Sequence, residues 1–321
     1  MTTRTKPSSD TGGRRKGVLT IAYGRQKYVT QAINLARSIR LRDPHLPLAV
    51  ATDLPAAAFA DHYDEVIPWD FSEWPELVSK LELYALTPFD TTLFLDADCL
   101  VVRSLEQVFG YFEGQDFAVF GRNAPDAIWF RSVAAVQAVV PSPTYPIFNG
   151  GLYYFTRSAR AEEVFRRARA LFPHYDHLQL HRSRTQREND EPLISLAMAQ
   201  LGLQAMSTPG LDILHAPERP HYDLHLDVLG GESRFVRRGQ VVEPIVTHFV
   251  GVRDQLYVYQ RESLRLAVAD RGLPFPWCHD WVIAGLAYAR WFVAQVLPRY
   301  RRQLQDRCRR ALHARLRARA G

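Results

Sequence analysis

The chain has 321 residues, of which 47% are hydrophobic and 23% charged, a composition that predicts one main globular domain with attachments. Its three cysteines, Cys99, Cys278 and Cys308, are odd in number and widely spaced, which argues against a disulfide framework or a zinc cluster and favours a reducing cytoplasm. The net charge of +6 belongs to the ends: residues 299–321 carry +8 and residues 1–16 carry +4, so the body carries −6. We therefore expect no binding of nucleic acid by the body.

The front of the chain alternates between strand and helix patterns. Residues 1–16 are polar and basic, so we expect a disordered segment without a signal peptide. Strands are predicted at residues 17–24, 46–53 and 65–68, and a helix by the apolar positions from 32 to 41. This alternation predicts a mostly parallel sheet covered on both faces, with ligands bound at the carboxyl ends of the strands. Asp53 lies at such an end.

Two carboxylates, in Asp96-Ala97-Asp98, follow the apolar run of residues 92–95 and precede the apolar run of residues 99–102. A short apolar run is typical of a strand buried on both faces, whose packing does not explain acids at its exit. Mg²⁺ and Mn²⁺ prefer oxygen ligands and keep positions open for phosphate oxygens. The triplet predicts a site for a metal and a diphosphate, and a turn or helix cap is the alternative.

The second half of the chain contributes further candidate motifs. A turn at Asn149-Gly150-Gly151 feeds a strand within residues 148–155, and residues 160–171 form a helical pattern. Another helix begins near Asp190-Glu191, with Asp190 as the predicted N-cap. A last buried strand at residues 243–251 contains His248 and ends at Gly251.

In this order, Lys80, the Asp-x-Asp triplet, the Asn-Gly-Gly turn, Asp190-Glu191 and His248-x-x-Gly251 resemble glycosyltransferase family 8. The resemblance implies the GT-A nucleotide-diphospho-sugar transferase fold, a Rossmann-like α/β fold with a mixed, mostly parallel sheet, in a catalytic domain at residues 17–275. It also implies a metal-dependent transferase that moves a hexose from a nucleotide sugar, most simply a UDP-sugar, to an acceptor with retention of configuration. The acceptor class, whether glycan, lipid-linked or small molecule, stays open.

The resemblance also implies roles for individual residues. Asp96, Asp98 and His248 match the ligands of Mn²⁺ (or Mg²⁺). Lys80 and the Asn149–Gly151 turn match contacts to the donor, and Asp190 with Glu191 match the catalytic pair under the anomeric carbon. Retention by double displacement needs a carboxylate there, for which Asp190 and Glu191 are the candidates; same-face attack assisted by the leaving group is the alternative. The remaining expected donor contacts are Tyr28 (with Tyr23 as the alternative) against the base, together with Asp53, Ala97, Gly251 and Arg253.

Two positions depart from the family pattern. Glu191 stands where the family has glutamine, and Asp254 stands where it has a lysine on the diphosphate, which leaves Arg253 to supply that charge. Each matched residue also has a structural alternative: Asp190 as a cap only, His248 as a core histidine, and Lys80 as a surface lysine. The alternative functions are a nucleotidyltransferase and a membrane-associated scaffold with a decayed donor site.

The C-terminal part, residues 276–321, predicts amphipathic, Arg-rich helices. Residues 281–297 are apolar around Arg290 and marginal in length for a membrane span. After Pro298, an apolar residue recurs every fourth position among arginines, which is typical of a helix lying on anionic lipid. We expect a cytoplasmic protein that is peripheral on the inner face of the cell membrane, with a solvated charged end as the alternative. His215, His221 and His225 lack ligand spacing and predict no metal site.

Overall fold

The computed structural model describes residues 15–72, 74, 77–183, 186–217, 224–250, 256–272, 277–293, 297–298, 300 and 305. The chain divides into two compact units. The first comprises Met1–Tyr23, Leu46–Leu95 and Phe109–Ser207, and the second comprises Gly24–His45, Asp96–Val108 and Thr208–Gly321. Residues of the predicted 17–275 domain occur in both units.

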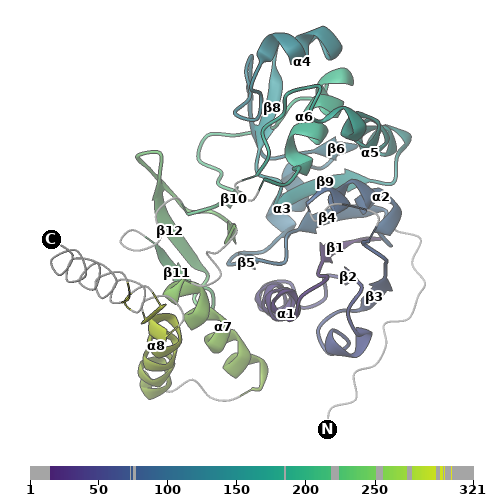
Figure 1. Ribbon diagram of the computed structural model, residues 1–321. Helices are drawn as coiled ribbons and strands as arrows, with labels where there is room; N and C mark the ends of the chain where they lie inside the picture. Colours follow the sequence, from purple (N-terminus) through teal and green to yellow (C-terminus); the bar gives the residue numbers. More distant parts are fainter. Residues whose placement is uncertain are drawn as a thin grey trace, which may run out of the picture. The chain divides into compact units, whose positions relative to one another are not determined.

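The first unit is built on a six-stranded sheet in the order β3-β2-β1-β4-β9-β6 (Figure 1). The four strands β3, β2, β1 and β4 are parallel to one another, whereas β9 is antiparallel to β4 and to β6. The bounds are β1 Lys16–Ile21, β2 Leu48–Thr52, β3 Glu65–Pro68, β4 Thr91–Leu95, β6 Phe117–Ala118 and β9 Leu152–Thr156. The predicted α/β class with a mostly parallel sheet is confirmed, and β3 has its predicted bounds.

The first unit also contains helices and a two-stranded sheet. An antiparallel pair is formed by β7 (Gly121–Ala124) and β8 (Tyr145–Phe148). The helices are α2 Leu83–Leu86, α4 Val133–Val139, α5 Ala159–Leu171 and α6 Asp190–Gln200, with 3₁₀ turns at Ala56–Ala58, Val78–Glu82 and Phe172–His174. A further short helix, α3 (Glu106–Tyr111), crosses the division between the units.

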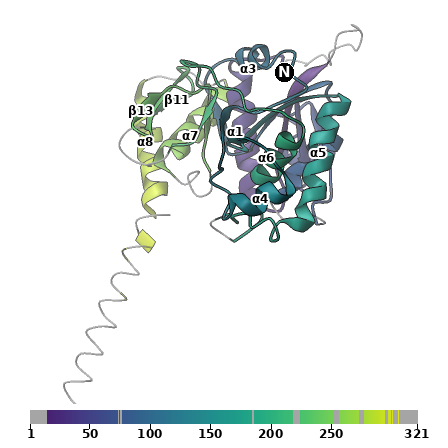
Figure 2. The ribbon, with the colours of Figure 1, turned by 90° about the horizontal axis from the view of Figure 1, so that it is seen from above.

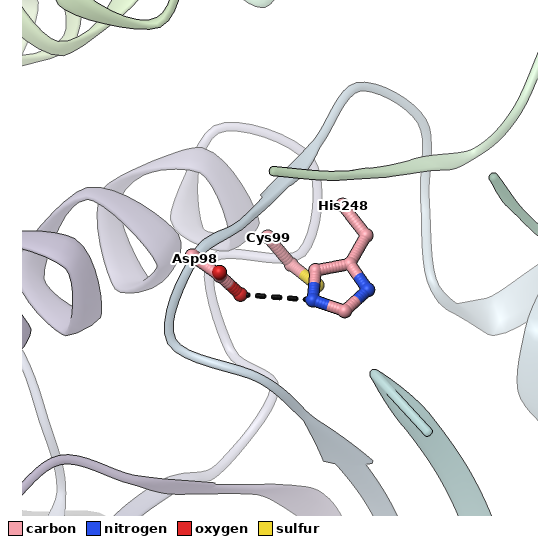
Figure 3. Close-up of side chains that lie close together, drawn as sticks. All are labelled: Asp98, Cys99 and His248. Atoms are coloured by element: carbon pink, nitrogen blue, oxygen red, sulfur yellow. Dashed lines mark ion pairs between the residues drawn. The ribbon is translucent and has the colours of Figure 1, made fainter. Parts of the chain in front are cut away.

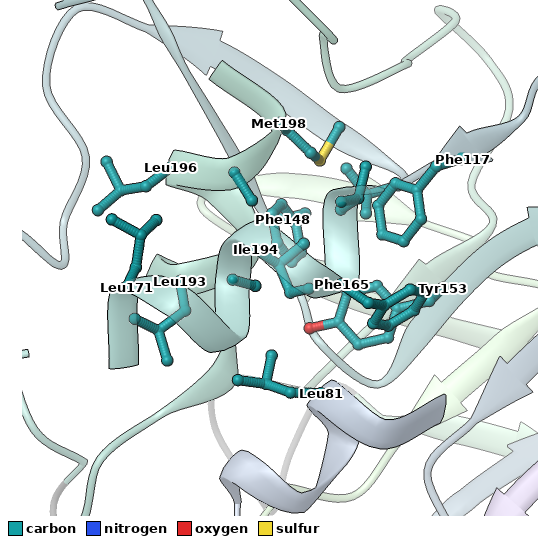
Figure 4. Close-up of a cluster of buried hydrophobic side chains, with 14 of the residues drawn as sticks. Leu81, Phe117, Phe148, Tyr153, Phe165, Leu171, Leu193, Ile194, Leu196 and Met198 are labelled. Carbon is teal, nitrogen blue, oxygen red and sulfur yellow. The ribbon is translucent and has the colours of Figure 1, made fainter. Parts of the chain in front are cut away.

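Two helices show why this unit has a large core. In α5, Val164, Ala168 and Leu171 are buried as the sequence predicts, and the Ser158 side chain caps the helix by accepting from the Ala161 N–H. In contrast, α6 is buried on nearly all sides, because its run from 192 to 199 contains no charged residue. Figure 4 shows its side chains among those of α5 and the neighbouring strands.

In the described residues of the second unit there are two three-stranded sheets and three long helices. One sheet has the order β10-β14-β5, and the other is the meander β11-β12-β13. The strand bounds are β5 Cys99–Val101, β10 Leu214–His215, β11 His225–Asp227, β12 Glu232–Arg237, β13 Gln240–Val242 and β14 Val246–His248. The helices are α1 Gln26–Arg40, α7 Tyr257–Asp270 and α8 Trp277–Trp291. The predicted last strand is thus present as β14, and the predicted helix around residues 32–41 is present as α1.

A separate apolar core holds the second unit together. Leu100, Leu226, Phe249 and Tyr259 are among its buried members, so β5 and β11 share a core with α7. The carboxylate of Glu262 is buried in the same region and accepts the Val228 N–H at 2.9 Å. Helices α7 and α8 lie side by side (Figure 2). Among the described residues, no helix combines the length and the apolar character needed to cross a bilayer.

Candidate active site

The three predicted metal ligands lie together in the second unit, with two carboxylates close to the imidazole of His248. The Nε2 atom of His248 lies 3.0 Å from Oδ1 of Asp98 and 3.4 Å from Oδ2 of Asp96. The His248 side chain is 6% exposed, whereas the side chains of Asp96 and Asp98 are 21% and 20% exposed, respectively. The carboxylates therefore keep access to solvent while the imidazole is fixed beneath them.

Strand pairing brings these residues together from distant parts of the sequence. In the antiparallel register of β5 and β14, His248 lies opposite Cys99. The pairing continues into the turn, because the Phe249 N–H donates to the Asp98 carbonyl at 3.0 Å. The turn itself is closed by the Cys99 N–H, which donates to the Asp96 carbonyl at 3.0 Å. The backbone thus determines where both aspartates stand relative to His248.

Helix α1 holds the far end of β5 in place. The buried Ser38 hydroxyl accepts the Val101 N–H at 3.0 Å and donates to the Leu35 carbonyl at 2.7 Å. The guanidinium of Arg42, just beyond the helix, donates to the carbonyls of Val102 and Val228. These bonds satisfy buried backbone groups that β5 alone would leave unpaired, so the short strand is rigid where it presents its ligands.

The donor set suits a hard divalent cation. Two carboxylates against one imidazole leave an excess of negative charge, and oxygen with imidazole nitrogen is a ligand set that Mn²⁺ accepts. Within the described part of the chain, one group of three metal-ligating residues lies close together, Asp98, Cys99 and His248, whose ligand atoms are all within 4.8 Å of one another (Figure 3). The residues therefore fit a divalent ion. The Cys99 thiol also lies beside them, although the sequence analysis placed this residue in a buried apolar run.

A second cluster lies in the first unit, around Lys80. Its ammonium Nζ donates to the Gly150 carbonyl at 2.9 Å and lies 3.9 Å from Oδ2 of Asp190. The same Asp190 oxygen accepts a short hydrogen bond from the Tyr153 hydroxyl. Asp190 is 1% exposed and Tyr153 is fully buried. A carboxylate this buried needs such partners, and the ammonium and the hydroxyl supply them.

Glu191 holds the Asn149–Gly151 turn from the other side. Its Oε1 accepts the Gly150 N–H at 2.7 Å, and its Oε2 accepts from Nδ2 of Asn189 at 2.8 Å. The turn is tightened further by Oδ1 of Asn149, which accepts the Gly151 N–H at 2.8 Å. Gly150 has no room for a side chain, since a Cβ there would lie 2.9 Å from Cγ of Glu191. The Lys80, Asp190, Glu191 and turn residues predicted separately are thus one hydrogen-bonded group.

The expectation that Asp190 caps its helix is wrong. The N-cap of α6 is Asn189, and Asp190 is the first helical residue. The Asp190 carboxylate is engaged by Tyr153 and Lys80, which belong to other elements of the fold. The Asn189 N–H donates to the Tyr175 hydroxyl at 3.1 Å. Burial raises the pKa of Tyr175 to about 12, so this hydroxyl stays protonated and donates to the His181 carbonyl.

The other predicted donor contacts fall in different places. In the first unit, Tyr23 stacks on Phe71 with ring centroids 4.3 Å apart, and burial raises the pKa of its hydroxyl, against which a hydrogen bond to Ser79 acts. Asp53 is exposed after β2. In the second unit, Tyr28 is half-buried in α1, beneath the ammonium of Lys27.

Three of the remaining predictions concern residues near the metal ligands in the sequence. Ala97, between the two aspartates, is 6% exposed. Gly251 and Arg253 lie outside the described residues, as do Asp254 and His221. His215 contacts Asp212 and Arg237, and His225 contacts Glu232, so neither belongs to the group of Asp98, Cys99 and His248.

Sequence reasoning missed the residues that complete the two clusters. The sequence analysis did not single out Tyr153 or Tyr175, and it placed Cys99 in the apolar run of residues 99–102. A signal for Tyr153 exists, because it stands two residues after the Gly150-Gly151 turn, on the strand that the turn feeds. No local signal marks Cys99, since its neighbour His248 comes from another strand.

Comparison with known proteins points to one broad class. No family model matches the chain. It is 28% identical over 129 residues to a putative UDP-glucuronate:xylan alpha-glucuronosyltransferase 3 of Arabidopsis thaliana, a match covering 35% of this chain and 20% of the relative. It is 27% identical over 161 residues to the putative glucuronosyltransferase 4 of the same plant, covering 43% of this chain and 28% of the relative. The chain is similar to glycosyltransferases. It spans less than a third of the length of these relatives.

Solved structures with some likeness to the chain carry the same class of name. A galactosyltransferase, LgtC, in complex with donor and acceptor sugar analogs has a TM-score of 0.49 at 15% identity, covering 82% of this chain and 99% of that one. The glycosyltransferase GlyE of Streptococcus pneumoniae has a TM-score of 0.38 at 18% identity, covering 59% and 45%. Mouse xyloside xylosyltransferase 1 has a TM-score of 0.44 at 11% identity, covering 72% and 96%.

Proposed function

We propose that this protein is a metal-dependent glycosyltransferase that moves a hexose from a nucleotide sugar, most simply a UDP-sugar, to a glycan, lipid-linked or small-molecule acceptor with retention of configuration. The observation that carries the proposal is the convergence of Asp96 and Asp98 on His248 at distances of 3.4 and 3.0 Å. A UDP-linked donor is supported by the curated relatives, whose names include one.

In this proposal the residues divide the work between binding and positioning. Asp96, Asp98 and His248 would hold Mn²⁺ or Mg²⁺, which when bound neutralises the charge of a leaving diphosphate. Lys80 would orient the Asn149–Gly151 turn through the Gly150 carbonyl and contribute positive charge beside the transferred sugar. Asn149, Gly150 and Gly151 would present that turn to the donor, with Tyr28, Tyr23, Asp53, Ala97, Gly251 and Arg253 as the remaining donor contacts.

For the retaining step we favour attack from the face of the leaving group over a covalent sugar–enzyme intermediate. A double displacement needs a carboxylate oxygen that is available beneath the anomeric carbon. Asp190 is 1% exposed and bonded by Tyr153, and both oxygens of Glu191 accept hydrogen bonds. These contacts suit two carboxylates that orient the turn. They do not suit a nucleophile.

The step can be tested with a donor whose sugar carries fluorine at carbon 2, which slows breakdown of a covalent intermediate. We expect intact-protein mass spectrometry to find no sugar adduct. We expect Glu191→Gln, which keeps an acceptor for the Gly150 N–H, to reduce transfer by less than about tenfold, or about 1.4 kcal/mol of barrier. A sugar adduct on Asp190 or Glu191 would establish the double displacement.

The activity itself is tested with a panel of donors. The full chain with Mn²⁺ is incubated with each common UDP- or GDP-sugar, UDP-glucuronate included, and released nucleotide is measured. We expect UDP release from one donor that depends on metal and falls at least about a hundredfold in the double variant Asp96→Asn/Asp98→Asn. Asp61→Asn, at an exposed acid of the first unit, serves as the matched control. Release of pyrophosphate from a nucleoside triphosphate would instead indicate a nucleotidyltransferase.

We further propose that the C-terminal part attaches the protein to an anionic membrane surface. In α8, Ile283 and Ala287 are buried one turn apart, at 5% and 0% exposed. Away from that packed side, Trp281, Val282 and Leu286 are 75%, 59% and 53% exposed. A helix with an outward apolar face, followed by nine arginines between residues 299 and 321, has the character of an interfacial helix beside anionic headgroups.

Sedimentation with vesicles tests this attachment. We expect the full chain to bind vesicles containing phosphatidylglycerol and not vesicles of phosphatidylcholine alone, with binding that weakens as salt is added. The double variant Val282→Asp/Leu286→Asp is expected to abolish binding. A matched variant, Val236→Asp/Val241→Asp, changes two exposed valines of the β11-β12-β13 meander and is expected to bind as the wild type does. Equal loss in both variants would contradict a role for α8.

A further inference from the structure

The thiol of Cys99 stands beside the proposed metal ligands. Its Sγ lies within 4.8 Å of a carboxylate oxygen of Asp98 and a ring nitrogen of His248 (Figure 3). Cys99 is fully buried and belongs to no disulfide. Its position is imposed by the sheet, because Cys99 and His248 are directly opposite in the pairing of β5 with β14. Directly opposed residues of an antiparallel pair present their side chains on the same face.

A thiol changes which ions such a group can hold. Mn²⁺ and Mg²⁺ prefer oxygen, whereas thiolate sulfur with imidazole and carboxylate is a ligand set of Zn²⁺ and other thiophilic ions. In a tetrahedral zinc site, ligand atoms about 2.0–2.3 Å from the ion lie roughly 3.5 Å from one another. The His248 and Asp98 atoms are 3.0 Å apart, and all three ligand atoms lie within 4.8 Å. Small side-chain rotations therefore suffice to close this arrangement.

We propose that Asp98, Cys99 and His248 form a second binding mode for a thiophilic divalent ion such as Zn²⁺, which excludes the oxygen-preferring ion of the transfer reaction. The two modes exclude each other because both use Asp98 and His248, while Asp96 belongs to the first and Cys99 to the second. On binding Zn²⁺, the thiol proton passes to the buffer. The consequence for activity, inhibition by Zn²⁺ in competition with Mn²⁺, rests on the proposed function.

Cobalt provides a readout that does not depend on activity. A thiolate bound to Co²⁺ gives an intense charge-transfer absorption in the near ultraviolet, which carboxylate and imidazole ligands lack. The experiment titrates the metal-free full chain with Co²⁺ and then adds Zn²⁺. The proteins compared are the wild type, Cys99→Ser, and the matched variant Cys278→Ser/Cys308→Ser, in which Cys99 is the single remaining cysteine.

We expect the absorption in the wild type and in Cys278→Ser/Cys308→Ser, its absence in Cys99→Ser, and its removal by added Zn²⁺. Competition titrations are expected to show Zn²⁺ affinity at least about tenfold weaker in Cys99→Ser. Should Cys99→Ser fail to fold by circular dichroism, Cys99→Val provides a β-branched replacement suited to a buried strand.

Two results would overturn the inference: an absorption that persists in Cys99→Ser, or none in the variant that retains only Cys99. These results are separate from the donor panel. Metal-dependent UDP release without a thiolate absorption would contradict the second binding mode and support the transferase activity. A thiolate absorption with no turnover and no UDP binding would contradict the transferase activity and support the binding of Zn²⁺ by Asp98, Cys99 and His248.

Discussion

Replacing Tyr153 with phenylalanine should destabilise the protein more than an ordinary buried hydroxyl loss does. The Tyr153 hydroxyl is buried and donates to the carboxylate of Asp190, which is 1% exposed and lies 3.9 Å from the ammonium of Lys80. A hydrogen bond to a charged group contributes about 1.5–3 kcal/mol, and an acceptor left unsatisfied in the interior costs about as much. We therefore expect Tyr153→Phe to lower the free energy of unfolding by about 2–3 kcal/mol.

Tyr145→Phe is the matched control for this prediction. Tyr145 is also fully buried in the first unit, but its hydroxyl donates to a neutral group, the Val140 carbonyl, at 2.7 Å. Its loss is expected to cost about 1 kcal/mol. Urea unfolding followed by circular dichroism measures both, with the midpoint shifting at constant slope. In an Asp190→Asn background, the cost of Tyr153→Phe should fall to about 1 kcal/mol, because the acceptor is then neutral.

Equal losses for Tyr153→Phe and Tyr145→Phe would refute the reasoning. So would an unchanged cost of Tyr153→Phe in the Asp190→Asn background. Either result would mean that the Tyr153 hydroxyl is not an important partner of a charged Asp190 carboxylate. The assignment of Asp190 as a residue that orients the Asn149–Gly151 turn would then lose its physical basis.

Two further predictions concern the turn and the second unit. Gly150→Ala places a Cβ 2.9 Å from Cγ of Glu191 and should cost about 1–3 kcal/mol and reduce transfer. Gly110→Ala, whose new Cβ has no atom of the described residues within 4 Å, should be neutral or stabilising. Equal effects of the two variants in urea unfolding would contradict this. Burial opposes ionisation of Asp227, but a backbone N–H and the Arg265 guanidinium outweigh it and hold its pKa below the ordinary value of 3.8. Because the folded-state pKa is depressed, this stabilisation is fully present above pH 3.8 and lost as the pH falls through the folded-state pKa. Asp227→Asn should therefore unfold at a lower urea concentration than the wild type near neutral pH, and the two proteins should converge in strong acid. A difference in unfolding free energy that stays constant with pH would be inconsistent with a stabilisation that depends on ionisation of Asp227.

Local patterns predicted the elements of the fold well. The strand at residues 65–68 has its predicted bounds, and the buried face of α5 is the predicted one. These succeed because strand and helix periodicities record which side chains face the core, and that record is local in the sequence. The prediction that Asp190 is the N-cap of α6 was wrong, because Asn189 and Asp190 are equally good N-cap residues by residue type. The choice was made by Tyr153 and Lys80, which bind the Asp190 carboxylate from other elements.

The sequence by itself determined the α/β class and the set of polar residues that carry the proposed chemistry, since these depend on residue type and order. Only the tertiary structure decided which of them act together. The pairing of β5 with β14 puts Cys99 beside His248, and the position of α6 puts Glu191 on the Gly150 N–H. Such contacts join segments far apart in the chain, and their register is determined by burying the sheet and helix faces, so no local pattern contains them.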